Sequence, residues 1–271
     1  MNNPETAVIH PTALVDSGAR FGAGVRIGPF CMVGADAELG DGVELVSHVV
    51  VAGRTRIGPR TRLFPFASIG HQPQDLKYHG EPSTLVIGAD CLIREGVTIN
   101  PGTEGGGMET VIGDRCAFLA NSHVGHDCHV GSNVILSNNV MLAGHVTVGD
   151  HVIIGGGAAV IQFARVGRHS FVGGLSGLEN DLIPYGTALG NRAYLGGLNI
   201  VGLQRRGFSR EEIHVLRRAY RLLFADEGTL LERVDDVAVA FPDSPLVEEV
   251  LSFIRDTGKR SICVPKDGRG A

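Results

Sequence analysis

The chain has 271 residues, in which 24 lysines and arginines stand against 29 aspartates and glutamates, for a net charge of −5. This balance argues against non-specific nucleic-acid binding, and no apolar run reaches the roughly 18 residues that a membrane span needs. The N-terminal residues are polar, without a basic segment followed by an apolar one, so we expect a cytoplasmic protein.

A six-residue period organises most of the chain. Aliphatic or aromatic residues return at this spacing in 26 hexads, and a small residue stands two positions before most of them. The repeated residues are Ile9, Val15, Phe21, Ile27, Val33, Leu39, Leu45, Val51, Ile57, Leu63, Ile69, Ile87, Ile93, Ile99, Ile112, Phe118, Val124, Val130, Leu136, Leu142, Val148, Ile154, Val160, Val166, Val172 and Leu178. Residues two apart share one side of a strand. The period therefore predicts a solenoid of short parallel strands with both positions inside, and three hexads per triangular turn would give between eight and nine turns.

Two residue types recur at fixed places in the hexad. Glycine follows the repeated residue in 14 of the 26 hexads. Because glycine reaches positive φ without a Cβ penalty, we expect these glycines to make the tight corners. Four of the five cysteines, Cys31, Cys91, Cys116 and Cys128, occupy the small position. They are expected to be buried small side chains, with no disulfide framework or cysteine metal site.

Two segments interrupt the period, at residues 71–84 and 100–108. The first is polar and contains prolines, and the second contains three consecutive glycines, Gly105 to Gly107. Insertions in a solenoid emerge as surface loops, often on the binding face. We expect both loops to pack near the histidine cluster described below.

Beyond Leu178 the pattern becomes helical. Ser209 and Glu212 form a capping box at the start of one helix, and two further helices are predicted at about 230–240 and 245–255. The sequence thus predicts a β-solenoid over residues 1–190 and a helical domain over 191–271 that covers its open end. Residues 203–221 carry six arginines against two glutamates, a patch that suits phosphate or an acidic partner or is simply a solvated helix face.

The densest cluster of reactive side chains runs from Ser122 to His129. His126 follows the inward Val124 by two residues, so it should lie near a corner and point away from the interior, where it could act as a general base oriented by Asp127. His123 and His129 lie on the outward face and could line one groove with His145. Three outward histidines would equally suit a zinc site between subunits. Spacing alone leaves a base, a metal site and an ordinary surface histidine open.

Several runs together carry a specific resemblance. They are His-Val-Gly-His-Asp-Cys at 123–128, Gln-Asp-Leu-Lys-Tyr at 74–78, Leu-Ala-Gly-His at 142–145 and Arg-Arg-Gly-Phe-Ser-Arg at 205–210. With the hexads, they make the chain similar to the UDP-N-acetylglucosamine acyltransferase family over nearly its whole length. The resemblance implies a mainly-β fold, a left-handed parallel β-helix with a C-terminal helical domain, assembled as a homotrimer with active sites between subunits. It also implies transfer of a 3-hydroxyacyl chain from acyl carrier protein to the glucosamine 3-hydroxyl of UDP-N-acetylglucosamine, the first step of lipid A biosynthesis, with no cofactor and no metal.

Carried over by the same resemblance, His126 is the general base, Asp127 orients it and the Gly144 N–H stabilises the oxyanion. Gly174 matches the position that gauges acyl-chain length, and the arginine patch fits acidic acyl carrier protein. The residues expected to contact the sugar nucleotide or the acyl donor are Asp75, Lys77, His123, His145, Gln162, Asn199, Arg205 and Arg206.

Three positions depart from the family pattern on the acceptor side. Asn100 and Ile161 stand where histidines are common, and Val201 stands where a glutamate is common. These departures leave open a 3-amino analogue of the sugar as acceptor. The related N-acyltransferase carries an extra N-terminal domain, which hexads starting by Ile9 argue against. A zinc carbonic anhydrase-like protein and a non-catalytic scaffold are the alternatives from other classes.

Overall fold

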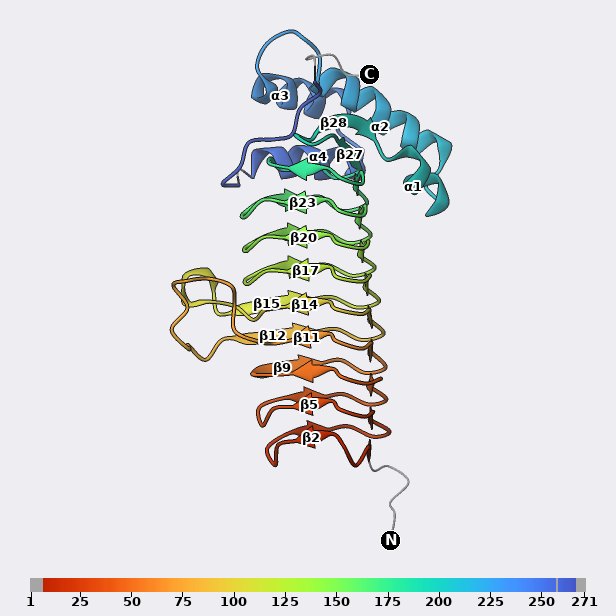
Figure 1. Ribbon diagram of the computed structural model, residues 1–271. Helices are drawn as coiled ribbons and strands as arrows, with labels where there is room; N and C mark the ends of the chain where they lie inside the picture. Colours follow the sequence, from red (N-terminus) through yellow and green to blue (C-terminus); the bar gives the residue numbers. More distant parts are fainter. Residues whose placement is uncertain (1–6, 257, 267–271) are drawn as a thin grey trace.

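The fold is a long coil of short strands whose C-terminal end is covered by helices (Figure 1). It is seen in a computed structural model that describes residues 7–256 and 258–266. Every repeated residue of the predicted hexads is the last residue of a strand, from Ile9 in β1 to Leu178 in β26. The coil strands β1 to β26 stack in parallel into three sheets, one on each face of the coil.

In the described part of the chain, the first sheet contains β1 (Val8–Ile9), β4 (Arg26–Ile27), β7 (Glu44–Leu45), β10 (Arg62–Leu63), β13 (Leu92–Ile93), β16 (Ala117–Phe118), β19 (Ile135–Leu136), β22 (Ile153–Ile154), β25 (Phe171–Val172), β27 (Gly186–Leu189) and β28 (Tyr194–Leu198). The second contains β2 (Leu14–Val15), β5 (Met32–Val33), β8 (Val50–Val51), β11 (Ser68–Ile69), β14 (Thr98–Ile99), β17 (His123–Val124), β20 (Met141–Leu142), β23 (Ala159–Val160) and β26 (Gly177–Leu178). The third contains β3 (Arg20–Phe21), β6 (Glu38–Leu39), β9 (Arg54–Ile57), β12 (Thr84–Ile87), β15 (Glu109–Ile112), β18 (His129–Val130), β21 (Thr147–Val148) and β24 (Arg165–Val166).

From β1 to β23, each coil strand pairs with the strand three positions further along the chain. Thr98 of β14, for example, pairs with His123 of β17, which pairs with Met141 of β20. Three hexads therefore make one turn of the coil. The small and aliphatic positions fill the interior, where Cys31, Cys91, Cys116 and Cys128 are buried as free thiols.

The expectation that the glycines after the repeated residue make the corners through positive φ is wrong for most of them. Positive φ falls two residues later in the turn, as at Asn121 (60°), Asp127 (58°) and His145 (61°). Asparagine, aspartate and histidine tolerate this conformation better than most side chains. The glycines are required for a different reason: a Cβ at Gly125 would lie 2.8 Å from the backbone of Ala143 in the next coil.

The two insertions leave the coil at the same edge, between β11 and β12 and between β14 and β15, and lie side by side (Figure 1). The Asn100 amide donates to the His71 carbonyl (3.0 Å), and the Glu104 N–H donates to Glu81 Oε1 (3.2 Å). The second insertion contains the 3-10 turn η1 (Glu104–Gly106). The two loops therefore form one connected assembly.

The C-terminal part contains the three predicted helices, α2 (Arg210–Leu223), α3 (Leu230–Ala240) and α4 (Pro245–Arg255). The capping box of Ser209 and Glu212 is present at α2. The antiparallel β27–β28 pair and the short α1 (Ile200–Arg205) were not predicted from the sequence. The β27–β28 pair extends the first sheet to residue 198 and so spans residue 190, where the boundary between the two domains was predicted. That boundary stays a prediction. Within the described residues, no helix combines the length and the apolar character needed to cross a membrane.

Candidate active site

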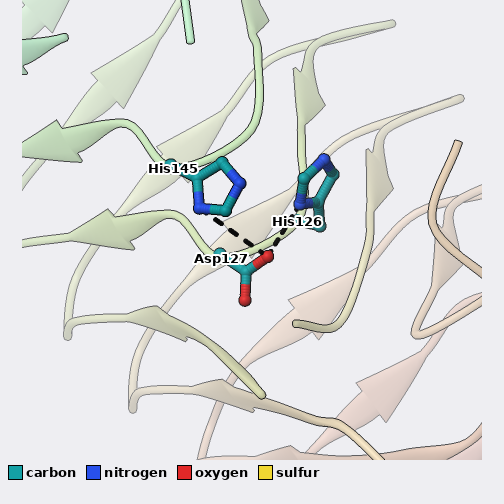
Figure 2. A group of neighbouring side chains, drawn as sticks. All are labelled: His126, Asp127 and His145. Atoms are coloured by element: carbon teal, nitrogen blue, oxygen red, sulfur yellow. Dashed lines mark hydrogen bonds and ion pairs between the residues drawn. The ribbon is translucent and has the colours of Figure 1, made fainter. Parts of the chain in front are cut away.

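The histidine cluster lies at the edge of the coil from which both insertions emerge. His126 and Asp127 form the turn between β17 and β18, and Gly144 and His145 form the same turn one coil further on. Asp127 and His145 both have left-handed φ, and the Asp127 carboxylate meets Thr103 of the second insertion. The stacking of coils therefore brings residues 18 positions apart into contact (Figure 2).

His126 and Asp127 form a hydrogen-bonded pair, with 2.7 Å between Nδ1 and Oδ2. The Asp127 side chain is fully buried, whereas that of His126 is 16% exposed. An ionised carboxylate only accepts hydrogen bonds, so Nδ1 carries a proton, and in the neutral ring Nε2 has the lone pair. This is the arrangement of an imidazole base held by a carboxylate.

Gly144 lies directly against the imidazole of His126. A Cβ at this position would be 2.5 Å from His126 Nε2 and 2.6 Å from Cε1, so no other residue fits without moving the ring. The N–H of Gly144 donates to no acceptor among the described residues. A ring nitrogen and an unengaged backbone donor thus lie close together, as an acyl-transfer site needs.

Two further histidines flank the base. The ring of His145 meets that of His126 edge-on at 4.9 Å and stacks on Phe163 at 4.4 Å, and His123 Nδ1 is 2.7 Å from the Thr98 hydroxyl. Burial lowers the pKa of both His123 and His145. Both rings are therefore neutral near pH 7 and add no positive charge beside His126.

The remaining predicted residues at this edge differ in exposure. Asp75 reaches from the first insertion to within 3.9 Å of His126 Nε2. Lys77 and Gln162 are exposed, and the Gln162 carbonyl accepts from Arg260 Nε (3.1 Å). His129 is exposed on the outer face of β18.

A second group of predicted residues lies on another face of the coil. Asn199, Arg205 and Arg206 line a pocket of about 490 Å³ between α1 and the first sheet, on the side away from the insertions (Figure 1). The Arg206 guanidinium donates to the His151 carbonyl (2.7 Å), and burial lowers its pKa. Gly174 is exposed in the turn between β25 and β26, at a third place.

The three departures from the family pattern have separate surroundings. Asn100 is only 5% exposed and its amide donates to backbone carbonyls of the first insertion. Ile161 packs against the core. Val201 lines the pocket with Asn199 and the arginines.

The metal hypothesis built on His123, His129 and His145 does not match the geometry. Among the described residues, the side chains that converge are His126, Asp127 and His145, whose candidate ligand atoms lie within 4.8 Å of one another. Both Asp127 oxygens already accept hydrogen bonds from protein donors. Because Oδ2 is shared between the Thr103 hydroxyl and Nδ1 of His126, the arrangement fits proton transfer better than metal binding.

Sequence reasoning missed the residues that hold Asp127. Thr103 donates to both carboxylate oxygens, and the Thr110 hydroxyl accepts from the Asp127 N–H (2.8 Å). Thr110 occupies the small position of its hexad, so the sequence pattern predicted only a buried interior residue there. Thr103 lies in an insertion, where no period relates it to the histidines.

Two family models match the chain. One, described as UDP N-acetylglucosamine O-acyltransferase, domain 2, covers residues 181–263, and the other, bacterial transferase hexapeptide (six repeats), covers residues 18–53 and 109–144. A curated relative from Methylobacterium radiotolerans, named acyl-[acyl-carrier-protein]--UDP-N-acetylglucosamine O-acyltransferase, is 76% identical over 96% of this chain and 95% of its own length. A relative of the same name from Bartonella henselae is 53% identical over 95% and 94%.

Solved structures agree with these relatives. The UDP-N-acetylglucosamine acyltransferase from Campylobacter jejuni is 39% identical, with a TM-score of 0.90 over 95% of this chain and all of its own. The UDP-N-acetylglucosamine O-acyltransferase from Moraxella catarrhalis is 40% identical, with a TM-score of 0.90 over 94% and 99%. Together with the hexapeptide match, these structures confirm the predicted left-handed parallel β-helix and its C-terminal helical domain.

Proposed function

The chain belongs to the UDP-N-acetylglucosamine O-acyltransferase family, and from this premise we propose how its residues share the work of acyl transfer. The enzyme moves an acyl chain from acyl carrier protein to UDP-N-acetylglucosamine, the first step of lipid A biosynthesis. The observation that carries the assignment of the site is the packing of His126 between Asp127 and Gly144.

The reaction needs a base, an oxyanion donor and a returned proton. His126 Nε2 removes the proton from the sugar 3-hydroxyl, whose oxygen attacks the thioester carbonyl of the 3-hydroxyacyl donor. The Gly144 N–H donates to the oxygen of the tetrahedral intermediate. Collapse breaks the carbon–sulfur bond, and the imidazolium returns its proton to the departing thiolate. The products are an ester on the sugar and a free carrier thiol.

The energetic contributions are ordinary for such groups. A positioned general base contributes about 10²- to 10⁴-fold in rate, and one oxyanion donor about 3 kcal/mol. Asp127 contributes indirectly by fixing the Nδ1 tautomer and stabilising the imidazolium that forms when the hydroxyl loses its proton. Neutral His123 and His145 favour this step, because a cation beside Nε2 would oppose its protonation.

The assembly is proposed to be a homotrimer with its sites between subunits. Support comes from the separation within one chain of His126 and Asp75 from Asn199, Arg205 and Arg206, which line another face. A neighbouring subunit would supply the second group to the first. Sedimentation velocity should give a trimer, and mixing inactive His126→Ala with inactive Arg206→Ala subunits should restore part of the activity.

Roles in recognition are divided accordingly. Asp75, Lys77, His123, His145 and Gln162 are proposed to contact the sugar nucleotide or acyl donor at the base. Asn199, Arg205 and Arg206 are proposed to hold phosphate groups, and the exposed arginines of residues 205–221 to meet acidic acyl carrier protein in the cytoplasm.

The hydroxyl acceptor is favoured over a 3-amino sugar. The relatives' names specify O-acyl transfer, and the buried Asn100 amide is engaged in holding the first insertion. A transfer assay that offers UDP-N-acetylglucosamine and its 3-amino analogue in parallel, with 3-hydroxyacyl carrier proteins of several chain lengths, tests this directly. Product from the ordinary acceptor is expected. Product from the amino analogue alone would overturn the choice, and the best chain length tests the role of Gly174.

A further inference from the structure

The second insertion does more than flank the cleft, because it holds the carboxylate that orients the base. Thr103 is only 5% exposed. Its N–H donates to Asp127 Oδ1 (2.9 Å) and its hydroxyl donates to Oδ2 (2.6 Å). The same Oδ2 accepts the Nδ1 proton of His126 (2.7 Å). Thr103 therefore donates hydrogen bonds to both oxygens of the Asp127 carboxylate.

Thr103 is itself fixed from the other side. Its carbonyl accepts from the N–H groups of Gly106 and Met108, both at 3.0 Å, which close the 3-10 turn η1 over the site. A Cβ at Gly106 would overlap the Asp127 carboxylate, whereas a Cβ at Gly105 would meet nothing within 4 Å. The two adjacent glycines thus differ sharply in what they allow.

The first insertion supports this turn. Glu81 Oε1 accepts from the Glu104 N–H (3.2 Å), and Glu81 Oε2 accepts from the His79 N–H (2.8 Å). The first insertion also carries Asp75, which faces His126 Nε2. The two loops therefore approach different nitrogens of the His126 ring. Thr103 contacts the Nδ1 side through Asp127, and Asp75 lies near Nε2.

We propose that Thr103 is a positioning residue for acyl transfer: through its two hydrogen bonds it sets the orientation and the charge of Asp127, and thereby the basicity of His126. This inference rests on the proposed role of His126. Hydrogen bonds to a charged group are worth about a power of ten or more in an equilibrium. The Thr103 hydroxyl draws negative charge from Oδ2, so without it Asp127 interacts more strongly with imidazolium, and His126 holds its proton more tightly.

The test compares Thr103→Val, which is nearly isosteric but lacks the hydroxyl, with Thr103→Ser, which keeps it. In Thr103→Val, kcat should fall at least about tenfold with KM for both substrates within about twofold, because Thr103 is only 5% exposed and its side chain is engaged with Asp127. The acid limb of the kcat/KM profile should move to higher pH. Thr103→Ser should recover most of the lost rate and restore the wild-type limb. Thr147→Val, at an exposed position on the outer face of β21, is the matched control for the same side-chain change.

Two more measurements keep the proposal falsifiable if Thr103→Val is unstable. Gly106→Ala should slow transfer while Gly105→Ala does not, with thermal unfolding followed in both. In an Asp127→Asn background, Thr103→Val should cost little further rate, because the two residues act as one unit. Equal kcat and equal pH profiles for the valine and serine variants would overturn the role of Thr103. If the Thr103 variants show no effect but His126→Ala is inactive in the same assay, this inference fails and the proposed function stands. An active His126→Ala would overturn the proposed function itself.

Discussion

The contact between Gly144 and the ring of His126 gives a quantitative prediction for Gly144→Ala. The added Cβ would lie 2.5 Å from Nε2 and 2.6 Å from Cε1, where carbon atoms in contact ordinarily lie about 3.5 Å apart or more. The ring must therefore retreat by about 1 Å, against the hydrogen bond from its Nδ1 to Asp127. A displacement of this size at a reacting group costs about a hundredfold in rate, which is about 2.7 kcal/mol of activation free energy.

The assay is the initial rate of carrier thiol release with both substrates saturating, with thermal unfolding measured in parallel. Alanine keeps the backbone N–H, so the variant reports the position of the base and leaves the oxyanion donor in place. Gly34→Ala is the matched control, because a Cβ there has its nearest neighbour at 3.6 Å, an ordinary contact. A kcat for Gly144→Ala within threefold of wild type would refute the packing of His126 on which the site is built.

Three further results are expected. Burial, with His151 and Arg206 nearby, lowers the pKa of His169 from 6.5 to about 4. Because the unfolded chain takes up this proton at higher pH than the folded chain, the free energy of unfolding should fall by up to about 3 kcal/mol as the pH is lowered from 6.5 to 4. Urea unfolding of His169→Phe should lack that part of the pH dependence. Dialysis against a chelator should leave activity unchanged, whereas loss of activity that zinc alone restores would support the metal alternative. Arg205→Ala should raise KM for acyl carrier protein about tenfold in a salt-dependent way with little change in kcat, and a fall in kcat alone would contradict a binding role.

The coil could be predicted because its physics is local and repetitive. From Ile27 onward each hexad buries its repeated apolar residue, so many repetitions report the same environment, and every repeated residue ends a strand. The corners were harder. The sequence shows many glycines, but not whether a glycine serves the φ angle or the close approach of the next coil, as at Gly125.

The site was predictable only in part for a related reason. His126, Asp127, Gly144 and His145 lie in the periodic region, where 18 residues make one turn and neighbours can be counted. Thr103 lies in an insertion, whose path is set by contacts such as that between Glu104 and Glu81. No spacing rule relates such a loop to the histidine it serves.

Separation along the coil sets another limit. Asn199 and Arg206 were expected to contact the sugar nucleotide or the acyl donor, and α1 holds them on a different face of the chain from His126. The sequence shows which residues are present, but it does not show the neighbouring subunit that would bring them close to His126. The short α1 escaped notice because its six residues carry no helical periodicity of useful length.

The most direct test of the account is the transfer rate of His126→Ala, measured on folded protein with 3-hydroxyacyl carrier protein and UDP-N-acetylglucosamine, with the product identified by mass spectrometry. We expect a sugar ester from the wild type and a kcat at least a hundredfold lower in the variant, with unchanged thermal unfolding and assembly. A variant that forms the same ester at near wild-type rate would contradict the assignment of His126 as the base.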